Sequence, residues 1–383
     1  MSIRVFVASL VSLGIGISLK ILYVARVKKN SAACEAATTE HQNIRSVKDV
    51  MYRYAFEESD DGFPIRHTLR SPLARAVYDR MKHQQKHQNS THRHWYEMKM
   101  DNFPPRLVEK YVASEKDQES AEFLENCYDK ADWIFTQIWQ GVAKSFLTWF
   151  VSVTSANALL GRGSMFVFSR NQFHSLIQKD ETWKAKKLLD LGAGDGVVTR
   201  VMEPNFDEVF VTEVSKPMIW KLEEKNYKVL GIDDWANGSH QFDLTACLNV
   251  LDRCSKPLSI LTDIKRSLVP GGRVVIAVVL PFRPYVENGK NQHKPEEYVP
   301  VKGHTFEEQV KSFIEDVFEP NGFTVERFTR VPYLCEGDLQ QSFYVLDDAV
   351  FVLRASDESY HASDESAHAG DESIHVDAES NDV

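Results

Sequence analysis

The stretch KLLDLGAGDG at residues 187–196 most constrains what this chain can fold into. Its apolar residues Leu188, Leu189 and Leu191 are typical of a buried strand, and they lead directly into three alternating glycines. Glycine allows positive φ angles and leaves no side chain between the backbone and a ligand. A buried strand that ends in such a loop before a helix is typical of nucleotide-type cofactor sites in open α/β sheets. The stretch therefore predicts such a site, and its surroundings must identify the cofactor.

Short apolar runs alternate with helical segments from this loop onward, which predicts a mostly parallel sheet. The last two strands, joined by a long turn around 332–338, are expected to form an antiparallel pair. This ending differs from the double mononucleotide repeat of dinucleotide enzymes. The seven expected strands are 187–191, 208–212, 227–231, 242–248, 272–280, 323–330 and 342–353, and the expected helices between them include 197–202, 216–225 and 258–268.

The N-terminus carries an uncharged apolar run, residues 5–19, with basic residues on both sides. This pattern predicts a signal peptide or signal anchor over 1–30, followed by a linker over 31–68. Whether the segment is cleaved stays open. We therefore expect the endoplasmic reticulum or the secretory pathway, with membrane association through the N-terminus, and the mitochondrion as the alternative. If this part is lumenal, the sequon at Asn89 predicts a glycoprotein.

Residues 69–170 are expected to form a helical region that packs on the sheet domain, 171–354. A helix is expected at 70–81, and the aromatic side chains within 107–150 have helical spacing, which is typical of core packing. Glycines break the periodicity within 159–169, which suits a loop lying over a cleft.

Two histidine-containing segments lie outside these elements. Residues 83–94 are rich in His, Gln and Asn and are expected to form a solvated loop. His92 and His94 are spaced for a metal, but no acidic or cysteine partner is near them in the sequence. The tail, 355–383, repeats a seven-residue acidic unit with one histidine per copy and is expected to be disordered.

Charge and cysteine usage exclude several functions. The formal net charge of −10 argues against a nucleic-acid-binding surface. The five cysteines are widely spread and form no CxxC pair, so neither a zinc cluster nor a disulfide framework is expected. We therefore expect buried free thiols and no metal site.

The glycine loop has the spacing Gly192-x-Gly194-x-Gly196, and Val197 stands where a dinucleotide fingerprint requires glycine. Asp190 lies just before the loop, where a carboxylate can face a positively charged ligand group. The ammonium or sulfonium of S-adenosylmethionine suits it, whereas a pyrophosphate would be repelled.

Two further polar residues follow the second and the fourth strand of the predicted sheet. Glu213 stands where an acidic residue takes the ribose hydroxyls of an adenosine, and Asn249 ends the fourth strand, beside the switch point. Together these residues predict an S-adenosylmethionine pocket, with S-adenosylhomocysteine as the product. The expected fold is α/β, a Rossmann-like class I S-adenosylmethionine-dependent methyltransferase with an N-terminal helical subdomain.

Several longer blocks make a family resemblance specific. RSPLARAVY, LLGRGSMFVFS, LLDLGAGDG, CLNVLDRC, LPFRPYVEN and FTRVPYLCEGD followed by YVLDDAVFVL resemble the DREV, or methyltransferase-like protein 9, family. The similarity runs from about 70 to 354. The longer His-rich segment before Trp95 and the repeat tail depart from the family pattern, but neither touches these blocks.

The resemblance implies a protein-histidine N-methyltransferase that modifies the pros nitrogen in His-x-His motifs with a small residue between. By resemblance, Glu213, Asn249 and Tyr333 contact the cofactor, and Asp252 orients the target histidine as the catalytic residue. The partners are then proteins that carry such motifs, and the oligomeric state stays open. Two alternatives remain: a methyltransferase for a small molecule or lipid, and a catalytically silent membrane-associated adaptor.

Overall fold

The computed structural model of the chain describes residues 70–88, 90–147, 160–161, 163–286 and 293–356. The chain divides into two units, Met1–Lys82 and His83–Val383. The described part of the first unit is the beginning of helix α3 (Pro72–Gln88). The predicted N-terminal apolar segment, the linker, Asn89 and the repeat tail lie outside the described residues. Within the described ranges, no helix is long and apolar enough to cross a membrane.

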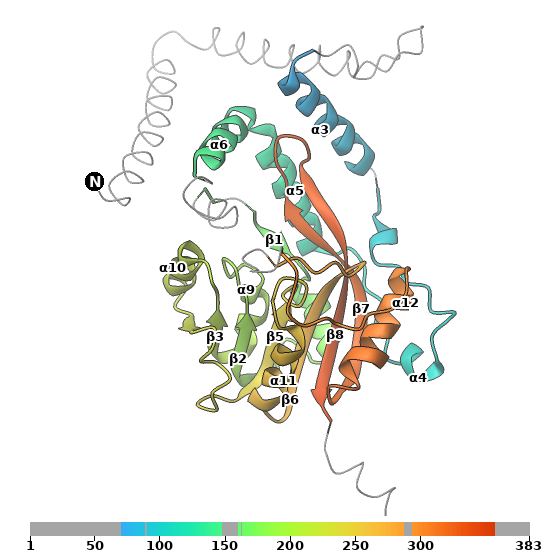
Figure 1. Cartoon of the computed structure of the whole chain (residues 1–383). Helices are drawn as coiled ribbons and strands as arrows, with labels where there is room; N and C mark the ends of the chain where they lie inside the picture. Colours follow the sequence, from blue (N-terminus) through green and yellow to red (C-terminus); the bar gives the residue numbers. More distant parts are fainter. Residues whose placement is uncertain (1–69, 89, 148–159, 162, 287–292, 357–383) are drawn as a thin grey trace, which may run out of the picture. The chain divides into compact units, whose positions relative to one another are not determined.

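The second unit is built on one eight-stranded sheet with the order β1-β7-β8-β6-β5-β2-β3-β4 (Figure 1). The five strands from β4 to β6 are parallel, whereas β8 is antiparallel to both β6 and β7. This is the expected Rossmann-like α/β arrangement with an antiparallel final pair. The strands are β1 (Met165–Phe166), β2 (Ala185–Leu191), β3 (Phe206–Thr212), β4 (Lys228–Leu230), β5 (Phe242–Leu248), β6 (Leu268–Leu280), β7 (Phe323–Glu336) and β8 (Phe343–Ala355).

Two sequence predictions about the sheet edge are wrong. The segment 159–169, expected to be a loop, contributes β1, which pairs with Leu334 and Cys335 of β7 and makes the sheet eight-stranded rather than seven-stranded. The turn expected around 332–338 begins later, because β7 continues through Pro332 to Glu336. Proline is tolerated there because β7 lies near the sheet edge, where a missing N–H interrupts little of the ladder.

Helices cover both faces of the sheet and bury two large apolar cores, and a smaller cluster of Val211, Leu222 and Tyr227 lies beside α10. One core holds side chains of α4, α11, α12 and η4, and the other holds side chains of α5, α8 and α9. Strand β8 serves both, since Phe351 and Leu353 face the first core while Val350 and Val352 face the second. The helices are α4 (Pro105–Val108), α5 (Gln118–Asp132), α6 (Ile134–Leu147), α8 (Arg170–Ile177), α9 (Thr199–Met202), α10 (Lys216–Glu224), α11 (Pro257–Ser267), α12 (Phe306–Ser312), the π-helix η4 (Phe313–Phe318) and the 3-10 helices η2 (Arg93–Trp95) and η3 (Glu203–Asn205).

The His-rich segment is not the solvated loop that its composition suggested. Its first part continues α3 to Gln88, and His92 is only 2% exposed, stacked on Trp95 with ring centroids 3.8 Å apart. His87 Nδ1 and His92 Nε2 are 3.2 Å apart, and burial lowers the pKa of both imidazoles to about 4. Two neutral rings therefore share a hydrogen bond at pH 7. No metal cluster of three or more ligands occurs within the described ranges.

Candidate functional site

The glycine loop after β2 has the backbone that only glycine adopts easily. Gly192, Gly194 and Gly196 have φ angles of 70°, 57° and 74°. A Cβ on Gly192 would lie 2.9 Å from a methyl group of Val250, and one on Gly196 would lie 2.8 Å from Leu222. A Cβ on Gly194 would meet nothing within 4 Å. Close contacts with neighbouring side chains therefore favour glycine at positions 192 and 196. Position 194 faces open space, as expected of a position that lies against a ligand.

Glu213 follows β3 directly and lies across the mouth of this loop. Its Oε2 accepts a hydrogen bond from the Gly194 amide at 3.0 Å, and its Oε1 accepts from the amides of Val214 and Ser215 at 2.8 Å each. A carboxylate oxygen can accept two hydrogen bonds, so Oε2 keeps a free acceptor site for a ligand hydroxyl. The structure thus joins Glu213 to the glycine loop.

Asp190, near the end of β2, lies under the loop rather than openly at its surface. The carboxyl group is 2% exposed, and its Oδ2 accepts a hydrogen bond from Thr199 Oγ1 at 2.6 Å. Burial raises the pKa of Asp190 to about 7, against the hydrogen bond from Thr199, which lowers it. Thr199 begins α9, which has four residues where a helix over 197–202 was expected. The Asp190 carboxyl group is therefore bonded to the start of a single short turn and not to the N-terminus of a long helix.

Asn249 follows β5 and has a left-handed backbone with φ 56°. Its amide Nδ2 donates to Oδ2 of Asp348 on β8 at 2.9 Å. The other atom of each group, Asn249 Oδ1 and Asp348 Oδ1, is buried and has no hydrogen-bond partner among the described residues. An unpaired buried acceptor such as Asn249 Oδ1 is costly, so a donor from a bound molecule is the simplest way to satisfy it.

Asp252 lies in the same loop, three positions after Asn249, and is 4% exposed. Its Oδ2 is 3.1 Å from Arg253 Nε, and its Oδ1 is buried without a partner in the described part of the chain. Burial raises the pKa of Asp252, and the charge of Arg253 opposes this effect. The backbone amide of Tyr285 donates to the Asp252 carbonyl at 2.7 Å, which ties the loop to the segment after β6.

Tyr333 on β7 belongs to the same group of polar side chains. Its hydroxyl donates to Met165 Sδ on β1 at 2.6 Å. Burial raises the pKa of Tyr333 well above its usual value, and the negative charges of Asp348 and Asp252 raise it further. The structure therefore brings the predicted residues Asn249, Asp252 and Tyr333 to one edge of the sheet, with the glycine loop and Glu213 on the neighbouring strands.

Sequence reasoning missed Asp348 and Thr199. A signal for Asp348 was present, because YVLDDAVFVL places two acidic residues inside an otherwise apolar strand. Charged residues are almost never fully buried without a partner, so an aspartate in such a run marks a polar site. Its pairing with Asn249 could not be read from the sequence, since the two residues are far apart in the chain.

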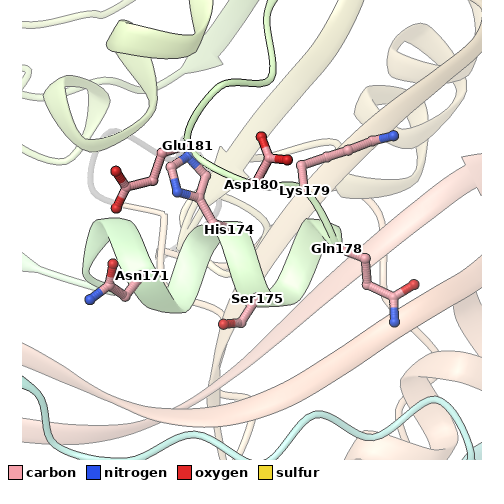
Figure 2. Close-up of a pocket in the computed structure, with 7 residues that line it drawn as sticks. All are labelled: Asn171, His174, Ser175, Gln178, Lys179, Asp180 and Glu181. Carbon is pink, nitrogen blue, oxygen red and sulfur yellow. The ribbon is translucent and has the colours of Figure 1, made fainter.

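A separate hollow of about 410 Å³ lies beside α8, and its lining residues all precede β2. It shares no residue with the glycine loop and is therefore not the cofactor site. Figure 2 shows Ser175 and Gln178 projecting away from His174 and Glu181, so the polar groups do not converge on one point. His174 already pairs with Asn205, with His174 Nε2 and Asn205 Oδ1 3.0 Å apart.

With this geometry in place, the comparisons with known proteins decide the family. A family model described as DREV methyltransferase matches residues 95–355, more than half of the chain. The chain belongs to the DREV methyltransferase family. The matched part contains all eight strands and each site residue described above. The family is one of methyltransferases, which agrees with the S-adenosylmethionine pocket that the loop predicted.

Other similarities of the DREV-family chain are more distant. The methyltransferase AacuQ of Aspergillus aculeatus is 30% identical over 97 residues, which are 23% of this chain and 30% of that protein. The match therefore spans less than a third of that relative's length. Among solved structures, an S-adenosylmethionine-dependent methyltransferase from Clostridium acetobutylicum has 12% identity and a TM-score of 0.33, covering 48% of this chain and 89% of that chain. The N-methyltransferase NodS of Bradyrhizobium japonicum, in complex with S-adenosylhomocysteine, has 14% identity and a TM-score of 0.29, covering 45% and 80%.

Proposed function

We propose that this DREV-family methyltransferase methylates the pros nitrogen of histidine in protein His-x-His motifs with a small residue between. The observation that carries the proposal is the buried Asp252 carboxyl, whose Oδ1 has no partner among the described residues, beside the cofactor edge of the sheet. A histidine N–H is a donor of the kind that such an oxygen lacks. The resemblance of CLNVLDRC and FTRVPYLCEGD to the family supports the same acceptor.

The chemistry asks the protein mainly to orient the acceptor. Imidazole has a reference pKa near 6.5 and is mostly neutral at pH 7, so its lone pair needs no strong base. A carboxylate that accepts the tele N–H fixes the tautomer and leaves the lone pair on the pros nitrogen. We assign this role to Asp252 Oδ1, and Arg253 at Oδ2 favours the charged carboxylate. The negative charge of the Asp252 carboxylate then stabilises the imidazolium that forms on methyl transfer.

The residues on the neighbouring strands fit the cofactor. S-adenosylmethionine, when bound, supplies a methyl group on a positively charged sulfur. Gly194 leaves room beside the loop, Glu213 Oε2 can accept a ribose hydroxyl, and Asn249 Oδ1 can accept from an N–H or ammonium group. Tyr333 closes the same edge from β7. With both reactants bound, these buried surroundings would exclude water from the pair.

The proposal is tested by methyl transfer from labelled cofactor to a His-Ala-His peptide, with the modified atom located by mass spectrometry and NMR. A Gln-Ala-Gln peptide and a His-Arg-His peptide are the controls. We expect transfer to the first peptide only, at the pros nitrogen. A lipid extract and a small-molecule extract run in parallel, and labelling there without peptide labelling would contradict the proposal, as would absence of turnover.

Asp252→Asn tests the role of the carboxylate. We expect kcat to fall by about 100-fold or more, the usual effect of losing a positioned acid or base, because the amide cannot stabilise the imidazolium. Affinity for S-adenosylhomocysteine, measured by calorimetry, should stay within about twofold of wild type. Asp263→Asn on α11 is the matched control, since this carboxylate pairs with Arg266 on the surface. Near-normal turnover of Asp252→Asn would remove Asp252 from the mechanism.

A further inference from the structure

Asp348 occupies an unusual position for a fully buried acid. It lies on β8 and stands in register with Val279 of β6 and Val331 of β7, so strands flank it on both sides. It is 0% exposed. Because β8 runs antiparallel to β6, its first half lies at the carboxyl end of the parallel strands, where the loop after β5 begins (Figure 1).

The contact between Asp348 and Asn249 fixes which way the amide points. Asn249 Nδ2 donates to Asp348 Oδ2 at 2.9 Å, so Asn249 Oδ1 must face away from the carboxyl group. The backbone of Asn249 is held as well, since its amide N–H donates to the Ala277 carbonyl at 2.9 Å and its φ is 56°. Without Asp348 the amide could turn and present its nitrogen instead of its oxygen.

The protonation state of Asp348 suits this contact. Burial raises its pKa to about 8; the hydrogen bond from Asn249 opposes this rise, and the charge of Asp252 adds to it. The charge of Asp347 on the same strand also raises the pKa of Asp348, and the charge of Asp348 in turn raises the pKa of Tyr333 on β7. At pH 7 Asp348 is then mostly a neutral acid, which accepts from Asn249 through one oxygen and keeps its proton on the other.

We propose that Asp348 is a positioning residue of the methyltransferase site, which turns the Asn249 amide so that its Oδ1 accepts a donor of the bound cofactor. The inference rests on the proposed role of Asn249 in cofactor binding. Asp348 itself touches neither reactant. It acts through a neighbour, as outer partners of ligand-binding groups commonly do.

The test measures binding of S-adenosylhomocysteine by calorimetry to full-length variants. We expect Asp348→Ala to weaken binding by about tenfold, the effect of losing one hydrogen bond, and to raise KM for the cofactor more than it lowers kcat. Asp348→Asn should stay within about threefold of wild type, because its amide offers a carbonyl to Asn249 Nδ2 and an N–H in place of the acid proton. The double variant Asp348→Ala with Asn249→Ala should bind no more weakly than Asn249→Ala alone.

Asp347→Asn is the matched control, because this neighbour is 47% exposed and pairs with Arg330 on the surface. It should bind S-adenosylhomocysteine like wild type. If Asp348→Ala does not fold, the volume-conserving pair Asn249→Asp with Asp348→Asn replaces it. That pair keeps the hydrogen bond with donor and acceptor exchanged, and should recover at least fivefold of the affinity lost in Asn249→Asp alone.

Wild-type affinity in Asp348→Ala would overturn the inference, and so would additive losses in the double variant or no recovery in the exchanged pair. Binding of S-adenosylhomocysteine requires no methyl acceptor, so these results do not depend on the histidine substrate. Failure of the proposed function would instead show as a wild-type protein that binds S-adenosylhomocysteine but leaves the His-Ala-His peptide unmodified.

Discussion

Asp190 shows how a single buried carboxyl can set a pH dependence. Its pKa is raised to about 7 in the folded protein, mainly by burial, whereas an unfolded aspartate titrates near 3.8. Between these values the unfolded chain has released a proton that the folded protein still holds. The contribution of Asp190 to the free energy of unfolding therefore falls as pH rises from about 4 to about 7, and it is lost above pH 7.

Asp190→Asn isolates this contribution. The variant keeps an acceptor for the Thr199 hydroxyl but has no carboxyl group that titrates at position 190. Its stability relative to wild type should therefore increase as pH rises from about 4 to about 7. The increase is at most about 1.4 kcal/mol per pH unit. Urea unfolding of both proteins at pH 5, 6, 7 and 8 measures it. A constant difference between variant and wild type across these pH values would contradict the raised pKa.

The residues of the site were only partly predictable from the sequence. Glu213 and Asn249 could be proposed from the sequence because they follow the parallel strands β3 and β5, and the ends of parallel strands meet at one edge of a sheet. Asp348 escaped this reasoning, since β8 is antiparallel and places the beginning of the strand at that edge. Asp190 was found, but its burial under Thr199 depends on how short α9 is, and no local pattern gives that length.

At the scale of elements, the glycine loop joins β2 to α9 and packs against α10. Gly194 and Gly196 have similar φ angles but different surroundings, because a Cβ on Gly196 would lie 2.8 Å from Leu222 of α10 and 3.0 Å from Tyr227. An alanine at a positive φ costs about 1–2 kcal/mol wherever it stands. Overpacking against α10 adds about 1–3 kcal/mol at Gly196 alone.

We therefore expect Gly196→Ala to lower stability more than Gly194→Ala does. For affinity toward S-adenosylhomocysteine we expect the opposite order, with the larger loss in Gly194→Ala. Only a side chain at position 194 would project into the open space beside the loop. Thermal unfolding and calorimetry on both variants measure the two effects. Equal loss of cofactor affinity in folded samples of both variants would show that Gly194 does not face the ligand.

Elements with strong apolar runs were predicted well, and those that depend on distant partners were not. The expected strand 242–248 agrees with β5 (Phe242–Leu248), whose side chains are buried on both faces. Strand β1 has two residues and exists only because β7 offers an edge, so no periodicity could indicate it. The helices α12 and η4 were not predicted, although they bury aromatic side chains against β8.

At the scale of the whole molecule, the family match and the sheet end at the same place. The match ends at residue 355, and β8 ends at Ala355, which pairs with Phe323. The amide of Ser356 then donates to the Gly322 carbonyl at 2.9 Å and completes this edge. Residues 357–383 should therefore be dispensable for the fold and for methyl transfer.

Deletion of 357–383 should leave the melting temperature within about 1 °C of wild type, less than the shift that 1 kcal/mol produces in a chain of this size. Deletion from Val350 onward should abolish the cooperative transition, because it removes the middle of a strand that pairs on both sides. Calorimetric scans and the peptide assay compare the two truncations. A large loss of turnover after the shorter deletion would give the tail a role in catalysis.

The position of β8 also has a consequence for biosynthesis. This strand is the last of the eight along the chain, yet it lies inside the sheet between β6 and β7. During translation β7 can join the sheet only after β8 has left the ribosome, because β8 lies between β7 and β6. The hydrogen bond between Asn249 and Asp348 forms no earlier than that. A nascent chain therefore carries its glycine loop and Asp252 long before it has a completed site. The site is therefore complete only near the end of the chain's own synthesis, once the last strand has paired.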